Sequence, residues 1–123
     1  MEISQFWKSV LEQDTAPVVL CDLQHIIVYM NPAAKTRYKN DLTGKSLFDC
    51  HTPKANEMIV KVVEWFAADK AHNKVNTFRN DKENKDVYMI ALRDGGGELI
   101  GYYEKHEYRT AETMNKYDLY QGG

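Results

Sequence analysis

The chain has 123 residues, of which 43% are hydrophobic and 28% are charged, with a formal net charge of -2. This length fits one domain with its own core, and the balance excludes a disordered chain. The Lys and Arg residues are scattered, so no basic stripe offers the phosphate neutralisation that nucleic-acid binding requires. No run reaches the roughly eighteen apolar residues of a membrane span. We therefore expect neither nucleic acid nor a membrane as a partner.

The chain contains two cysteines, Cys21 and Cys50. The first ten residues carry Glu2 and Lys8 among single apolar positions, which is not the pattern of a signal peptide. Disulfides are rare in the cytosol, where thiols are kept reduced. We therefore expect a cytoplasmic protein with reduced thiols.

The N-terminal segment, residues 1–14, is predicted to form an amphipathic helix from Glu2 to Gln13. Its apolar residues recur at helical spacing, and they are Ile3, Phe6, Trp7, Val10 and Leu11. The helix either packs on its own domain or pairs with a second copy of the chain. Pro17 ends it, because proline lacks an amide proton and favours extended geometry before it.

Two short apolar runs, 18–22 and 26–30, predict a first antiparallel pair of strands around a turn at 23–25. Asn31 and Pro32 then predict a helix start, with Asn31 as the cap and Pro32 at the first helical position. This short helix extends to about Tyr38. The turn-rich residues that follow predict an irregular connection.

The longest helix is predicted from Pro53 to about Lys70, with one wide apolar face. Three strands are predicted after it, at 75–79, 85–93 and 98–106, and they form a meander. The polar stretch from Glu107 onward predicts partial helix and then fraying at the closing Gln-Gly-Gly. We take residues 15–109 as the domain and 110–123 as a polar C-terminal tail.

The predicted order is one helix, two strands, short helices, a long helix and three strands. This order indicates an α+β fold with a five-stranded antiparallel sheet and helices on one face. Within the strand at 85–93, two-residue alternation places Tyr88, Ile90 and Leu92 on one face and Val87, Met89 and Ala91 on the other. The sequence does not decide which of these faces lines the core.

Three runs of residues resemble PAS domains over about Ala16 to Arg109. The first is a D…(I/V)xYxNPAA pattern formed by Asp22, Ile27, Tyr29, Asn31, Pro32, Ala33 and Ala34. The second, Arg93 to Gly101, matches the last hairpin of the family. The third, Gly44 to Lys54, is similar to the Gly-Arg…Asn-Cys-His-Pro-Pro-Lys-Ser run of PAS domains appended to bacterial hemerythrin-like proteins, with Asp49, Thr52 and Ala55 departing from it.

The resemblance implies a sensory or interaction module rather than an enzyme. It implies a cavity for a small molecule between the long helix and the sheet, and coupling to a partner through terminal helices. One scaffold can carry many functions, so the site residues must decide between them. A ligand-free dimerisation module, joined through the N-terminal helix as a homodimer, is the alternative. A Cys-dependent enzyme is a third hypothesis, which we do not prefer.

The ligand-site prediction centres on Cys50 and His51, just before the long helix. A helix N-terminus lowers the pKa of a thiol and favours anions, and His51 adds an ionisable donor. A small anionic or polar ligand fits such a place, although Cys50 could equally be a buried apolar residue and His51 a capping residue. The full set of predicted ligand-binding residues is Cys50, His51, Trp65, Tyr88 and Tyr38.

The sequence names no cofactor. A haem would require His51 to turn inward as the axial ligand, and the Cys-containing motif of light-sensing flavin domains is absent. Zinc ligation by Cys21, His25, Cys50 and His51 lacks the usual spacing, so we predict no metal site. A nucleophilic Cys50–His51 pair lacks a recognisable third residue, whereas thiol redox sensing needs only an accessible, acidic Cys50.

Overall fold

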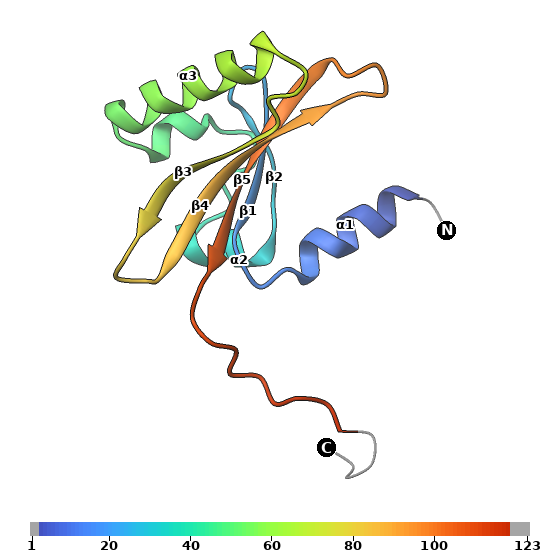
Figure 1. The fold of residues 1–123 in the computed structure, drawn as a ribbon, viewed down its shortest axis with the longest axis vertical. Coiled ribbons are helices and arrows are strands. Elements are labelled where there is room, and N and C mark those ends of the chain that lie inside the picture. The colour runs from blue at the N-terminus through green and yellow to red at the C-terminus, as the bar shows by residue number, and fades with distance from the viewer. Residues whose placement is uncertain (1–2, 119–123) are drawn as a thin grey trace.

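The computed structural model describes residues 3–118 (Figure 1). Its elements, in chain order, are α1 (Ile3–Gln13), β1 (Val18–Asp22), β2 (Ile27–Met30), α2 (Pro32–Tyr38), the 3₁₀ helix η1 (Leu47–Cys50), α3 (Pro53–Ala68), β3 (Lys74–Asn80), β4 (Lys85–Arg93) and β5 (Leu99–Tyr108). The predicted α+β order is confirmed, and most element ends lie within one or two residues of their predicted positions.

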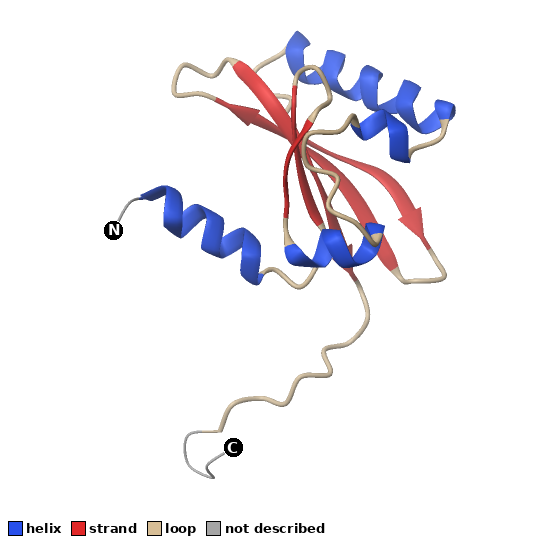
Figure 2. Cartoon of the chain, turned by 180° about the vertical axis from the view of Figure 1, so that it is seen from behind, coloured by secondary structure: helices blue, strands red, loops and turns tan. Residues whose placement is uncertain are grey.

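The five strands form one antiparallel sheet in the order β2-β1-β5-β4-β3. The last strand, β5, therefore lies in the middle, between β1 and β4. Helices α2 and α3 and the short η1 pack on one face of this sheet (Figures 1 and 2). The core lies between them and the strands, and its buried members are Val19, Cys21, Ile27, Met30, Ala34, Leu47, Ile59, Phe66, Met89 and Tyr102.

The structure decides which face of β4 points inward. Met89 is buried in the core and Val87 lines a cavity, so the face with Val87, Met89 and Ala91 is the inner one. Tyr88 therefore lies on the outer face of the sheet. In β5, Tyr102, Glu104 and His106 alternate onto the inner face and are all buried.

Helices α2 and α3 each begin at a side-chain cap. Asn31 caps α2 by accepting a hydrogen bond from the Ala34 amide, and Pro32 occupies the first helical position, both as predicted. Thr52 caps α3 in the same way through the amide of Ala55. The cap of α3 fixes where the chain leaves Cys50 and His51 and enters the long helix.

Helix α1 stays outside the core, where it extends away from the sheet (Figures 1 and 2). Its apolar residues Phe6, Trp7 and Val10 are exposed, with 63% of Trp7 accessible. The prediction that α1 packs on its own domain is therefore wrong for these three side chains. The C-terminal end of α1 is held through its backbone, because the side-chain amide of Asn31 donates from Nδ2 to the Leu11 carbonyl oxygen at 3.1 Å.

The partial helix predicted after Glu107 is wrong for the part of the tail that the structure describes, since 109–118 contains no helix. Met114 and Tyr117 are largely exposed, with 77% and 75% of their surface accessible. A short helix needs packing against the fold, because nucleation alone is unfavourable. The closing Gln-Gly-Gly lies outside the described residues. Among the described helices, none is both long enough and apolar enough to cross a membrane.

Candidate functional site

A cavity of about 550 Å³ lies between the end of α2, the first turns of α3 and the strands β3 to β5. Its residues are Arg37, Tyr38, His51, Thr52, Lys54, Ala55, Met58, Ile59, Thr77, Phe78, Asn80, Lys85, Val87, Glu104 and His106. The α3 side is mainly apolar, whereas the sheet contributes buried ionisable groups. A cavity of this size with a few converging polar groups is typical of a small-molecule site.

His51 and Glu104 form a polar pair in this cavity. His51 Nε2 lies 3.7 Å from Glu104 Oε2, and His51 Nδ1 lies 3.0 Å from the Leu47 carbonyl oxygen, to which it donates. The hydrogen bond with Cys50 and the Glu104 carboxylate raise the pKa of His51 to about 9, against the effect of burial. Burial raises the pKa of Glu104, and His51 opposes that rise. The pair therefore holds at least one proton at neutral pH.

Lys85 is the most deeply buried cation of the site, with 1% of its surface accessible. Its Nζ lies 3.2 Å from Glu83 Oε2. The other oxygen of the same carboxylate, Oε1, accepts from Arg37 Nη1 at 2.5 Å. The hydrogen bond from Arg37 holds the pKa of Glu83 below its usual value. One carboxylate is therefore shared by two cations from different elements, α2 and β4.

His106 lies two residues beyond Glu104 on β5 and is 6% exposed. Its Nδ1 is buried and has no hydrogen-bond partner among the described residues. Burial, together with Lys85 and Arg37, lowers the pKa of His106 to about 4, so the ring is neutral at pH 7. A buried ring nitrogen without a partner is uncommon, because leaving it unpaired costs about 1–3 kcal/mol.

Three of the predicted ligand-binding residues lie together. Tyr38 and His51 line the cavity, and burial raises the pKa of Tyr38. Cys50 lies beside His51, with 3.4 Å between its Sγ and His51 Nδ1, and its thiol donates to the Leu47 carbonyl at 3.1 Å. Cys50 is half-buried and does not line the cavity, and both Cys50 and Cys21 are free.

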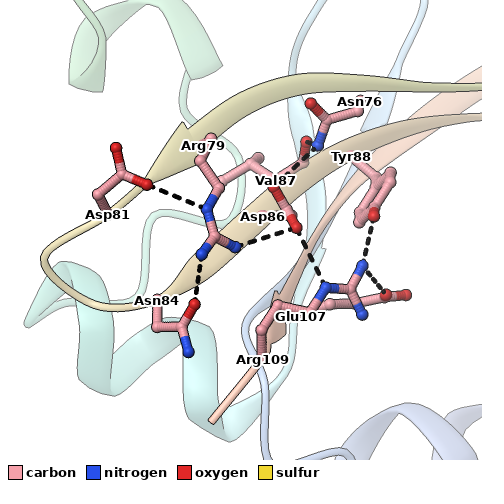
Figure 3. A network of polar contacts seen from close by, with 9 residues as sticks. All are labelled: Asn76, Arg79, Asp81, Asn84, Asp86, Val87, Tyr88, Glu107 and Arg109. Atoms are coloured by element: carbon pink, nitrogen blue, oxygen red, sulfur yellow. Dashed lines mark hydrogen bonds and ion pairs between the residues drawn. The ribbon is translucent and has the colours of Figure 1, made fainter.

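Trp65 and Tyr88 lie apart from the cavity. Trp65 is 40% exposed, and its ring stacks on His72 with the centroids 4.0 Å apart. Tyr88 belongs to a polar network on the outer face of the sheet, shown in Figure 3. There its hydroxyl accepts from Arg109 Nη2 at 2.5 Å, and Asp86 bridges Arg109 and Arg79.

The polar residues of the cavity that the predicted set lacks include Arg37, Lys85, Glu104 and His106. The alternation of β4 and β5 places Lys85 in phase with Val87 and Met89, and Glu104 in phase with Tyr102. A charged residue in phase with apolar neighbours on a strand is the signal that could have identified Lys85 and Glu104. No group of three His, Cys, Asp or Glu residues that could hold a metal ion occurs within residues 3–118.

The fold is similar to solved PAS domains. The PAS domain of a Colwellia psychrerythraea protein matches with a TM-score of 0.66 at 15% identity, covering 87% of this chain and 97% of that chain. The PAS domain of BvgS from Bordetella pertussis matches with a TM-score of 0.64 at 17% identity, covering 88% of this chain and 87% of that chain.

A sensory box sensor histidine kinase from Vibrio cholerae matches with a TM-score of 0.59 at 10% identity, covering 85% of this chain and 87% of that chain. No family model matches the sequence. No curated protein matches it either. At these identities the likeness concerns the fold, and the sheet order and the helices on its inner face agree with it. The chain therefore has the PAS fold.

Proposed function

We propose that the chain is a sensory module that binds a small molecule in the cavity between α3 and the sheet and relays the bound state to a partner. The observation that carries the proposal is the cavity of about 550 Å³ with His106 Nδ1 buried and unpartnered at its wall. A bound molecule would supply the missing partner. In this proposal the cavity binds and does not catalyse.

The sensory part of the proposal is supported by the structural neighbours, which include a sensor histidine kinase. It is also supported by contacts that lead from the cavity to the N-terminal helix. Glu104 and His106 face the cavity from β5, while Lys105 between them pairs with Asp14 at 2.5 Å, just beyond α1. The His106 amide donates to the Pro17 carbonyl in the same connection. A shift of β5 would therefore move the residues that follow the end of α1.

Native and denaturing mass spectrometry of the purified protein test the binding proposal. We expect an additional mass in the native spectrum that disappears on denaturation. The substitution Ala55→Trp fills the cavity from α3 and should abolish that mass, whereas Val60→Trp, at an exposed position of the same helix, should retain it. A protein with no additional mass, and no thermal shift with a panel of metabolites, would contradict the proposal.

A homodimer joined through α1 is the second candidate function. The observation that favours it is the exposed apolar stripe of Phe6, Trp7 and Val10. A cavity and a dimer interface are compatible, because they lie on different parts of the chain. The cytoplasmic location and the narrower likeness of Gly44 to Lys54 to hemerythrin-associated PAS domains stay predictions.

A further inference from the structure

The charges around the cavity do not balance. Arg37 and Lys85 share the single carboxylate of Glu83, which leaves one positive charge without a counter-charge. The His51–Glu104 pair contributes no net charge whether His51 is protonated and Glu104 ionised or both are neutral. Lys54, an exposed residue that also lines the cavity, adds a further cation. The cavity is therefore electropositive.

Two hydrogen-bonding groups at the Lys85 end have capacity for a ligand. An ammonium carries three N–H donors, and within residues 3–118 Lys85 Nζ makes one hydrogen bond, to Glu83. His106 Nδ1 makes none among the described residues. In the β4–β5 register Val87 lies opposite His106. Lys85, two residues before Val87, is therefore the diagonal neighbour of His106 on the same face. Long side chains at diagonal positions of an antiparallel pair can reach a common group.

The remaining wall of the cavity is apolar. It consists of Ala55, Met58 and Ile59 from α3, with Val87 and Phe78 from the sheet. A fully polar ligand would lose its hydration against this wall without compensation. A dianion would exceed the one uncompensated charge of the Arg37–Lys85–Glu83 group, because the Lys54 charge is exposed to solvent, and it would lie near the buried Glu104. The matching ligand has one anionic head and an apolar body.

We propose that the ligand is an amphiphilic monocarboxylate whose carboxylate lies between Lys85 and His106 and whose apolar body lies against α3. This inference rests on the proposed function, since it names the ligand class of the same cavity. One carboxylate oxygen accepts from the Lys85 ammonium, and the other accepts from Nδ1–H of the neutral His106 ring. Neither residue belongs to the Cys50–His51 run.

The test compares each carboxylate with a neutral molecule of the same body. Straight-chain monocarboxylates from butanoate to dodecanoate, and benzoate, are titrated calorimetrically into the full chain, beside their primary alcohols. We expect at least one carboxylate to bind about tenfold or more tightly than its alcohol, because a hydrogen bond to a charged group is worth roughly that factor or more. Acetate should bind weakly, because it has no apolar body.

The variant Lys85→Met keeps the length of the side chain and removes its charge. It should weaken carboxylate binding by about ten- to a hundredfold and leave alcohol binding unchanged. The control Lys82→Met removes an exposed charge from the neighbouring turn and should change neither. If Lys85→Met does not fold, judged by circular dichroism, the comparison of carboxylates with alcohols in the unmodified chain still decides.

Each outcome separates this inference from the proposed function. Alcohols that bind as tightly as carboxylates would overturn the carboxylate inference and leave a small-molecule cavity. A neutral molecule released from the purified protein would do the same, whereas a released monocarboxylate would support the inference. If no probe binds and the protein carries no additional mass, both the inference and the proposed function fail.

Discussion

Two histidines of the cavity have pKa values displaced in opposite directions. The pKa of His51 is raised to about 9, chiefly by its hydrogen bond with Cys50 and by Glu104. The pKa of His106 is lowered to about 4, chiefly by burial. The stability that protonated His51 provides is fully present below about pH 6.5 and is lost as the pH rises through about 9. His106 has the opposite effect on stability: it destabilises the folded chain at low pH, because the unfolded chain binds a proton at this ring more readily than the folded chain does.

The acid side of the stability curve should depend on His106. As the pH falls from about 6.5 to about 4, the unfolded ring gains a proton that the folded ring does not take, so the free energy of unfolding falls. Lys85, Arg37, His51 and Glu83 are the charged or titratable groups that act on this ring. The variant His106→Phe should remove on the order of 2 kcal/mol of the loss between pH 6.5 and pH 4.5.

Urea denaturation at pH 4.5, 5.5 and 6.5 measures this effect. The variant His72→Phe is the control, because His72 stacks on Trp65 outside the cavity. Equal slopes of stability against pH in the unmodified chain and in His106→Phe would contradict the prediction.

The sequence predicted only part of the cavity. His51 was selected because it lies in the motif before the long helix, and the structure places both His51 and Tyr38 at the cavity. Lys85 and His106 were missed, because local alternation assigns residues to two faces without deciding which face is covered. That decision belongs to the packing of α3 on the sheet, which only the tertiary structure shows.

At the scale of elements, Asn31 joins three segments through one side chain. Its Oδ1 accepts from the amides of Ala34 in α2 and Val18 in β1. Its Nδ2 lies within hydrogen-bonding distance of three carbonyl oxygens, those of Leu11, Asp14 and Ala16. The side chain is fully buried. It therefore fixes the start of α2, the entry into β1 and the end of α1 together.

Replacing this residue should cost far more than the loss of an ordinary helix cap. We expect Asn31→Ala to lower the free energy of unfolding by about 3 kcal/mol or more, because it leaves several buried backbone groups unpaired. The comparison is Thr52→Ala, which removes the exposed cap of α3 and should cost about 1 kcal/mol. Chemical denaturation measures both values. Similar losses in the two variants would show that Asn31 acts only as a cap.

The elements themselves were largely predictable, since alternation and cap residues act locally. The Asn31-Pro32 start and the long helix from Pro53 are confirmed because their signals lie within a few residues. Strand β5 runs to Tyr108, beyond its predicted end, because Tyr108 pairs with Lys85 across the sheet. Such pairing depends on residues far apart in sequence, so no local pattern marks it.

At the scale of the whole molecule, β5 connects the cavity to the N-terminal helix. Its inner residues Glu104 and His106 face the cavity, and Lys105 reaches Asp14 after α1. The apolar stripe of α1 precedes this connection, with Phe6, Trp7 and Val10 each more than half accessible. Clustered apolar residues at a surface commonly mark an interface. A shift in β5 would therefore change the position of α1, and with it a dimer interface formed through α1.

Trp7 is the residue with which to test this arrangement, because it is large, central in the stripe and 63% exposed. The protein should sediment as a dimer at micromolar concentrations, and Trp7→Glu should dissociate it, because a carboxylate in an apolar interface loses its hydration without gaining a partner. The control Gln5→Glu adds the same charge to the polar side of α1 and should leave the dimer intact. Analytical ultracentrifugation distinguishes the two species. A sedimentation coefficient unchanged by Trp7→Glu would place any dimer contact elsewhere on the chain, and α1 would then have no role in association.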